Sequence, residues 1–254
     1  MLQIHQFPCL EDNYGFLIHD PASGATAAID TPDAAEILRQ AEIKGWTITE
    51  IWNTHWHPDH AGGNADIVAV TGARVTGPAE VERIGKAADR VVDEGDVVAL
   101  GDIQARVLNV GGHTLGHIAY VFDDAKVGFV GDALFSMGCG RLFEGTPQQM
   151  WTSLSKIAAL PDEATLYCAH EYTASNARFA INVDPDNRAL QTRVAEVTAL
   201  RAAGKPTVPM TLALEKATNP FLRAPALKAA IGMESAADWE AFGEVRRRKD
   251  VFKG

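Results

Sequence analysis

Residues 54–60 read Thr54-His55-Trp56-His57-Pro58-Asp59-His60 and hold three of the eight histidines of the chain. A strand-like run ends just before them, so we expect the segment at the edge of a sheet. Pro58 disfavours helix at His57, and in an extended segment His55, His57 and Asp59 point to one side. Imidazole nitrogens and a carboxylate at close quarters suit zinc, iron or manganese. The heptapeptide therefore predicts part of a metal site.

More candidate ligands lie at the ends of other predicted strands. His113 sits in a glycine-flanked turn, and Asp132 and His170 each follow a strand-like run. Functional residues of α/β proteins often lie on such loops, so we expect these side chains to converge on one sheet edge. Four ligands from one short segment cannot all reach a single ion comfortably, so we expect a second ion or ligands from distant segments. His117 begins a strand, a position that fits a buried supporting residue as well as a ligand, so it is left outside the ligand set.

The first two thirds of the chain alternate β-branched or aromatic runs with turn signals, and this pattern predicts strands. The expected strands are residues 2–7, 14–19, 25–29, 48–53, 97–100, 104–110, 117–122, 127–130 and 165–169. A helix is expected at 34–44, with Asp33 as its N-cap and Gly45 as its stop. A second is expected from Pro147 to about Leu160, behind a capping box at Thr146.

Beyond residue 170 the strand signal disappears, and segments rich in Ala, Arg and Glu predict helices. They are residues 174–182, 188–203, 226–231 and 236–251, the last behind a capping box opened by Ser235. This change of character places a domain boundary near 170. We expect a mixed α/β domain over 1–170 and a small α-helical domain over 171–254.

Charge and composition exclude several classes of partner. The chain carries 23 basic and 33 acidic residues, a formal charge of −10, so it has no general attraction for nucleic acid or for an anionic membrane. A run of four basic residues, Arg246-Arg247-Arg248-Lys249, lies near the C-terminus. No run of about 20 apolar residues and no export signal is apparent, and the three cysteines suit reduced thiols. We expect a cytoplasmic protein, a monomer, that acts on a small molecule.

The metal motifs resemble those of the metallo-β-lactamase superfamily, and more narrowly the chain resembles the glyoxalase II (hydroxyacylglutathione hydrolase) family. The resemblance extends over the whole chain, in Asp12-Asn13-Tyr14, in residues 54–60, in Gly111-Gly112-His113, in Gly131-Asp132, in residues 138–145, in His170-Glu171-Tyr172-Thr173, in residues 218–223 and in residues 246–250. It implies an α/β fold, a metallo-β-lactamase-like αββα sandwich, followed by a small C-terminal α-helical domain.

The resemblance also implies a ligand set and a reaction. His55, His57 and His113 would bind one metal ion, Asp59, His60 and His170 a second, and Asp132 would bridge them. A hydroxide bridging two divalent ions, zinc first and iron or manganese as alternatives, would hydrolyse S-(2-hydroxyacyl)glutathione thioesters. The family substrate S-D-lactoylglutathione would give glutathione and D-lactate, the second step of methylglyoxal detoxification. Asp59 and Asp132 would take part in catalysis beside that hydroxide.

Family positions that bind glutathione fall on Arg141, Phe143, Tyr172, Arg246 and Lys249. Other family members carry a lysine and a tyrosine where this chain has Arg141 and Phe143. Arg141 keeps the positive charge, whereas Phe143 has no phenolic hydroxyl to donate. Arg246 and Lys249 are three positions apart and would share a helix face.

Three alternatives stay open on the sequence. The same metal motif serves other hydrolases of the superfamily, and with a single iron it serves persulfide dioxygenases that also bind glutathione. A non-catalytic metal-binding module is the third, but structural zinc sites usually close four ligands around one ion, and cysteine is common among them. The basic run at 246–249 also fits a solvated charge cluster that complements the end of a helix.

Overall fold

The chain forms two compact units in the computed structural model, which describes residues 1–254. Unit 1 comprises Met1–Asn109 and Gly116–Gly131, and unit 2 comprises Val110–Leu115 and Asp132–Gly254. The change of character at residue 170 therefore falls inside unit 2. No helix is both long enough and apolar enough to cross a membrane.

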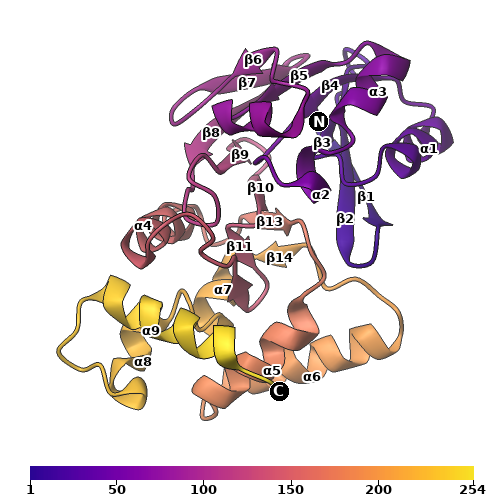
Figure 1. Ribbon diagram of the computed structural model, residues 1–254. Helices are drawn as coiled ribbons and strands as arrows, with labels where there is room; N and C mark the ends of the chain where they lie inside the picture. The colour runs from indigo at the N-terminus through magenta and orange to yellow at the C-terminus, as the bar shows by residue number, and fades with distance from the viewer. The chain divides into compact units, whose positions relative to one another are not determined.

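Unit 1 contains two sheets (Figure 1). In the first, β1 to β3 pair antiparallel and β3 to β6 pair parallel. Its strands, in spatial order, are β1 (Gln3–Cys9), β2 (Asn13–His19), β3 (Thr26–Ile29), β4 (Ile48–Trp52), β5 (Arg74–Gly77) and β6 (Arg90–Val91). The second is an antiparallel meander of β7 (Val97–Leu100), β8 (Ile103–Asn109), β9 (Ile118–Phe122) and β10 (Val127–Gly131).

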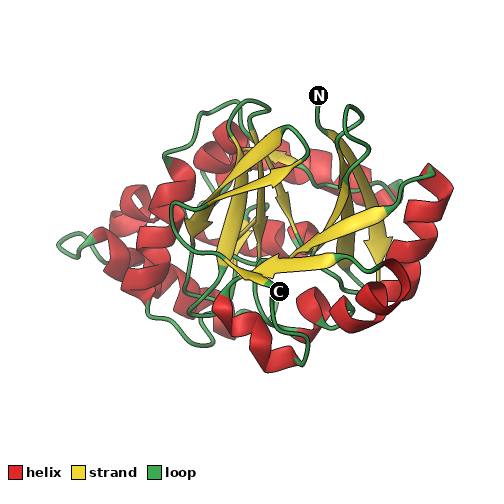
Figure 2. Ribbon diagram, turned by 90° about the horizontal axis from the view of Figure 1, so that it is seen from above, coloured by secondary structure: helices red, strands yellow, loops and turns green.

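The two sheets of unit 1 face each other, as the two layers of strands in Figure 2 show. Trp52 of the first sheet stacks on Phe122 of the second, with ring centroids 6.1 Å apart. Phe16 meets Phe129 at 5.4 Å, and the Tyr120 hydroxyl donates to the carbonyl of Asn53 at 2.8 Å. This apolar interior holds the end of β4, and with it residues 54–60, in a fixed place.

Helices cover the outer side of the first sheet. Helix α1 (Ala34–Lys44) buries Ile37 and Ala41, and α3 (Asn64–Thr71) buries Ile67, against sheet residues that include Ile51 and Val75. Unit 1 also contains α2 (Pro58–Ala61) and a 3₁₀ helix, η1 (Ala79–Ile84).

Unit 2 is mostly helical. Its core joins Met137 to residues of two helices, among them Ala177, Ala180, Leu190 and Val197. Its helices are α4 (Pro147–Ala158), α5 (Thr173–Val183), α6 (Arg188–Ala202), α7 (Leu212–Thr218), α8 (Ala224–Ile231) and α9 (Asp238–Val251). Its strands are the hairpin of β11 (Leu134–Phe135) and β12 (Gly138–Cys139) and the pair of β13 (Thr165–Cys168) and β14 (Met210–Thr211).

The expected strands and helices are confirmed, with ends within two residues of the prediction. Helix α1 runs over 34–44, with the Asp33 carboxylate accepting from the backbone N–H of Glu36 and Gly45 left-handed at its end. The capping box of Thr146 and Gln149 also forms. The predicted capping box at Ser235 is wrong: α9 begins two residues later, where the Glu240 carboxylate accepts from the N–H of Ala237 at 2.8 Å.

Candidate metal centre

The histidine heptapeptide leaves the end of β4 and enters helix α2. His57 is extended, with φ −57° and ψ 148°, as expected for a residue before proline. Pro58 occupies the first turn of α2, so Asp59 and His60 are helical. The expectation that the segment stays extended through Asp59 is therefore wrong: the proline constrains the residue before it and favours a helix after it.

Asp30, at the end of β3, fixes the orientation of two of these histidines. Its Oδ2 atom accepts from the Thr54 hydroxyl and from His60 Nδ1, both at 2.8 Å. Because that hydroxyl donates its only proton to Asp30, it accepts a hydrogen bond from His55 Nδ1 at 3.0 Å. Both imidazoles therefore carry their proton on Nδ1 when neutral, and Nε2 is the nitrogen that would bind an ion. Fixing a tautomer in this way is typical of the groups that support metal ligands.

His57 and Asp59 complete the ligand candidates of unit 1, and both are half-buried. Nδ1 of His57 faces Nε2 of His55 at 3.0 Å. The Asn13 amide donates to Asp59 Oδ2 at 3.2 Å and to the Asp59 carbonyl at 3.3 Å. Asp59 Oδ2 lies 3.6 Å from His60 Nε2. Unit 1 thus brings all four of its predicted ligands close together.

Unit 2 arranges two predicted ligands, His113 and His170, around the third, Asp132. Oδ2 of Asp132 lies 3.4 Å from His113 Nε2, and Oδ1 lies 3.4 Å from His170 Nε2. His113 Nδ1 donates to the carbonyl of Arg141 at 2.8 Å, so Nε2 is again the atom that would bind an ion. A carboxylate whose two oxygens face different imidazoles has the arrangement expected of a bridge between two ions.

Glycines allow the backbone to pass close to these ligands. A Cβ atom on Gly140 would collide with the Asp132 carbonyl and approach His113 Nδ1 to 3.0 Å. Gly112 has φ +149°, and a Cβ there would collide with Met150 of α4. The Ser153 hydroxyl of the same helix donates to the carbonyl of Gly111 at 2.7 Å. The turn that carries His113 is therefore fixed against α4.

His117, which the sequence left outside the ligand set, is fully buried. Its ring stacks on that of His55, with centroids 4.5 Å apart and planes 20° apart. It packs behind a predicted ligand, in the manner of a supporting residue.

The donor set fits a divalent ion. It consists of imidazole nitrogens and carboxylate oxygens, which zinc, iron and manganese all accept. The outer nitrogens of His55, His60 and His113 are held by a hydroxyl, a carboxylate and a carbonyl. These outer hydrogen bonds keep the inner nitrogens in the form that a metal needs.

The five predicted substrate residues all lie in unit 2. Phe143 is 63% exposed and its ring meets that of His113 edge-on, with centroids 5.2 Å apart. Tyr172 stacks flat on His170, with centroids 4.6 Å and planes 2° apart. Arg141 has an exposed side chain, while its carbonyl supports His113. These three residues thus surround predicted metal ligands.

The basic run on α9 is mostly paired within unit 2. Glu244 accepts from Arg247 and Arg248 at 2.7 and 2.8 Å. Arg246 is 5% exposed and donates to Asp250 Oδ1 and to the carbonyl of Cys139 at 2.9 Å.

Lys249 makes no ion pair, which distinguishes it from its three neighbours on α9. Its Nζ donates to the carbonyl of Ser175 at 3.1 Å. Burial, together with the positive charges of Arg246, Arg178 and Arg141, lowers the pKa of Lys249 from 10.5 to about 8. Lys249 therefore belongs to a group of cations that repel one another and would attract an anion.

The cysteines do not resemble nucleophiles. All three are unpaired by disulfides and buried. Burial raises the pKa of Cys9 and Cys168 to about 12 and that of Cys139 to about 11, so all three are thiols at neutral pH.

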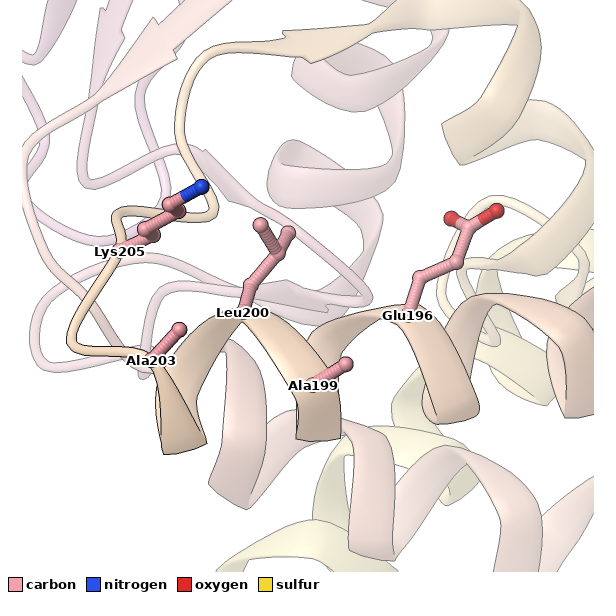
Figure 3. Close-up of a pocket in the computed structure, with 5 residues that line it drawn as sticks. All are labelled: Glu196, Ala199, Leu200, Ala203 and Lys205. Carbon is pink, nitrogen blue, oxygen red and sulfur yellow. The ribbon is translucent and has the colours of Figure 1, made fainter.

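A surface groove of about 440 Å³ runs along α6 in unit 2, between Glu196 and Lys205 (Figure 3). Ala199, Leu200 and Ala203 form its floor. None of its five lining residues is a histidine or a predicted site residue.

Sequence reasoning missed two residues that support the ligands, Asp30 and Asn13. Asn13 lies in a segment that carried the family resemblance, yet its contact with Asp59 spans 46 positions. Asp30 follows a buried strand, the same signal that identified Asp132, and that signal was available for it too.

Comparison with known proteins places these features in a class. The sequence model of the family described as "Metallo-beta-lactamase superfamily" matches residues 14–170, and that described as "Hydroxyacylglutathione hydrolase C-terminus" matches residues 171–252. Among solved structures, ETHE1 from Myxococcus xanthus is similar with a TM-score of 0.67 and 25% identity over 97% of both chains. The BLEG-1 B3 metallo-beta-lactamase has a TM-score of 0.66 and 19% identity, over 87% of this chain and 99% of its own.

The chain is therefore a member of the metallo-β-lactamase superfamily, with that fold and a helical C-terminal region. Two curated relatives are named hydroxyacylglutathione hydrolase. One, from Erythrobacter litoralis (strain HTCC2594), is 62% identical over 99% of this chain and 100% of the relative. The other, from Maricaulis maris (strain MCS10), is 58% identical over 99% of both. Within the superfamily, the chain belongs to the hydroxyacylglutathione hydrolase family.

This membership bears on the open alternatives. Relatives that match over their whole length carry the hydrolase name, so neither the persulfide dioxygenase nor a non-catalytic module is favoured. The superfamily fold, together with the clustered His and Asp side chains, supports binding of divalent metal.

Proposed function

We propose that this protein hydrolyses S-(2-hydroxyacyl)glutathione thioesters, and S-D-lactoylglutathione in particular, to glutathione and a 2-hydroxy acid. The observation that carries the proposal lies within unit 2. The main chain of Arg141 supports His113 and passes beside Asp132, while its exposed side chain belongs to a group of cations. An anionic thioester held by these cations would present its carbonyl near the predicted ligands. The names of the curated relatives support the same substrate class.

The proposal assigns the seven ligands to two divalent ions. His55, His57 and His113 would hold one, Asp59, His60 and His170 the other, with Asp132 shared. The superfamily match over residues 14–170 includes all seven positions, which supports placing them in one domain. We take zinc as the first candidate, with iron or manganese as alternatives. Residues 1–170 would then form the catalytic domain and residues 171–254 the glutathione-binding domain.

Two divalent ions at these ligands would supply a hydroxide near neutral pH and polarise the thioester carbonyl. The chain's own residues orient the reactants. The Asn13 amide directs the Asp59 carboxylate, which would accept a hydrogen bond from the attacking water. The leaving group is a thiolate whose conjugate acid has a pKa near 8.5, so no protein acid is needed to protonate it. The absence of an exposed cysteine nucleophile agrees with direct attack by water.

Glutathione carries two carboxylates, and the cations of unit 2 would recognise them. Arg141 and Lys249 offer exposed or half-buried donors, whereas Arg246 contributes charge from within. Tyr172 would provide an aromatic face and Phe143 only packing. The three free cysteines agree with action in the reducing cytoplasm, and we propose that the protein acts there as a monomer.

The test is hydrolysis of S-D-lactoylglutathione, followed as loss of thioester absorbance, by metal-replete protein. His57→Ala should lower kcat/KM at least about 100-fold, because losing a ligand exceeds the loss caused by an outer partner. His5→Ala, a matched substitution at a histidine that contacts Gln40, should leave the rate unchanged. Absence of turnover by the native protein would overturn the proposal.

A further inference from the structure

The hairpin of β11 and β12 connects a predicted metal ligand to a predicted substrate residue. Leu134 pairs with Cys139 and Phe135 with Gly138, leaving Ser136 and Met137 as the turn. Asp132 comes two residues before the hairpin and Arg141 two residues after it. Met137 has φ +54°, a left-handed conformation that is uncommon outside glycine. A hairpin this short has too few contacts of its own to hold its position.

Two side chains from the region of α7 hold the turn of this hairpin. The Glu215 carboxylate accepts from the Met137 N–H at 2.8 Å and from the Ser136 hydroxyl at 3.1 Å. The Asn219 amide donates to the carbonyls of Phe135 at 3.0 Å and Gly138 at 2.9 Å, bridging the two strands.

The same amide donates to Glu215 at 3.0 Å, so the two side chains form one network. Glu215, Asn219, Ser136 and Met137 all have no exposed surface. Buried polar groups require partners, and most partners of the turn come from the C-terminal region. The Asn176 amide of α5 also donates to the Ser136 carbonyl at 3.1 Å, while the Ser136 backbone hydrogen-bonds Cys168 of β13. The network therefore permits one position of the hairpin relative to α7.

We propose that Glu215 and Asn219 are positioning residues, which set the Asp132 carboxylate and the Arg141 side chain by fixing the hairpin between them. This inference rests on the proposed function. It assigns the C-terminal region a role in the metal centre as well as in substrate binding. Releasing the turn moves both ends of the hairpin, so metal retention and glutathione recognition should change together.

The test compares Glu215→Ala and Asn219→Ala with Glu215→Gln. Glutamine matches glutamate in shape: its oxygen accepts from Met137 and Asn219, and its amide donates to Ser136, whose hydroxyl turns to accept. We expect Gln at 215 to preserve activity where Ala does not. Lys216→Ala, on the same helix but in a surface ion pair with Asp162, is the matched control.

Three readouts are needed on folded, metal-loaded protein. In both Ala variants, kcat for S-D-lactoylglutathione should fall about 10-fold or more, since misplacement of about 1 Å costs up to 100-fold. KM should rise for that substrate but not for a lactoyl thioester of a small uncharged thiol, which does not need Arg141. The chelator concentration that removes half of the bound metal should fall as well.

Unchanged kinetics and unchanged chelator sensitivity in both Ala variants would overturn the inference. An equal loss on both thioesters with normal metal retention would also overturn it, because that pattern reflects folding alone. If the Ala variants do not fold, Ser136→Ala removes a single contact, and a smaller change in the same direction is then required. If the native protein fails to hydrolyse the thioester, the proposed function fails, while chelator sensitivity still tests the positioning role.

Discussion

Asp30 is the residue on which the orientation of two predicted ligands depends. Its carboxylate accepts a hydrogen bond directly from His60 and acts on His55 through the Thr54 hydroxyl. One carboxylate therefore sets the tautomers of two histidines. Its own backbone is left-handed, with φ +58°, a conformation that aspartate tolerates better than most residues. A single side chain thus links two ligands that are five positions apart.

Replacing Asp30 should weaken metal binding without removing a ligand. In Asp30→Asn, the amide nitrogen would face the donors of Thr54 and His60, so at least one ring would lose its support. We expect affinity for zinc to fall about 10- to 100-fold, measured by competition with a chelating dye. Asp33→Asn is the control, because asparagine caps α1 as well as aspartate does. Equal affinities in the two variants would contradict the assignment.

Lys249 should make substrate binding depend on pH. Its pKa of about 8 lies below the usual value, so its charge is present below pH 8 and lost as the pH rises through 8. KM for S-D-lactoylglutathione should therefore rise above pH 8, and Lys249→Arg should flatten that rise.

At neutral pH, Lys249→Ala should raise KM about 10-fold, in line with a hydrogen bond to a charged group, and change kcat little. Lys253→Ala, an exposed lysine near the same end of the chain, is the control. If KM is unchanged in both variants, Lys249 faces solvent and does not bind the substrate.

Among the elements, those with strong local signals were predictable and those held by distant contacts were not. Helix α1 has an N-cap, an apolar stripe and a C-terminal glycine, and its ends match the prediction. Helix α2 has four residues and depends on contacts such as the Thr31 N–H to the His60 carbonyl at 2.7 Å. Strands β11, β12 and β14 have two residues each, too few for an alternating pattern.

The candidate site divides in the same way. Its histidines lie in compact motifs that a single sequence reveals. Glu215, by contrast, acts on a turn 78 positions earlier, and nothing in its neighbourhood marks it as buried. Sequence therefore identifies the groups that would do chemistry, while the groups that orient them need the tertiary structure.

Helix α7 should make stability depend on pH through Glu215. Burial raises the pKa of Glu215 from 4.5 to about 7, against the effect of three donors. The folded state then binds this proton more tightly than the unfolded state. The resulting stabilisation is fully present below pH 4.5 and is lost as the pH rises through 7, a change of about 3 kcal/mol.

The comparison of interest is the metal-free protein with its Glu215→Gln variant, which keeps the neutral form at all pH values. We compare the free energy of unfolding of the variant with that of the native chain at each pH. As the pH rises from 4.5 to 7.5, this difference should change by about 3 kcal/mol in favour of the variant. Denaturant titrations at the two pH values measure it. Glu234→Gln, at an exposed glutamate, should gain nothing. A constant difference for Glu215→Gln would show that the carboxyl titrates normally.

At the scale of the whole molecule, the proposed metal centre links metal binding to the stability of the folded chain. Metal that binds the folded chain at about 1,000 times its dissociation constant adds about 4 kcal/mol of stability per site. For a chain of this size, we expect chelation to lower Tm by about 8 °C or more.

Thermal unfolding with and without chelator, followed by re-addition of zinc, measures this shift. His57→Ala should respond less to zinc than the native protein, and His5→Ala should respond equally. A Tm that does not change on metal removal would contradict the proposed metal centre.

The side chains that hold the β11–β12 hairpin, among them Asn219 and Arg246, also impose an order on biosynthesis. All seven proposed ligands have left the ribosome's active site by residue 170, but Asn219 comes 49 residues later and Arg246 comes 76 residues later. At about 5–20 residues per second, the nascent chain spends several seconds with its ligands made and its hairpin unanchored. Metal capture can then precede the locking of the hairpin, and the last helix to be synthesised completes a site whose ligands were all translated before it.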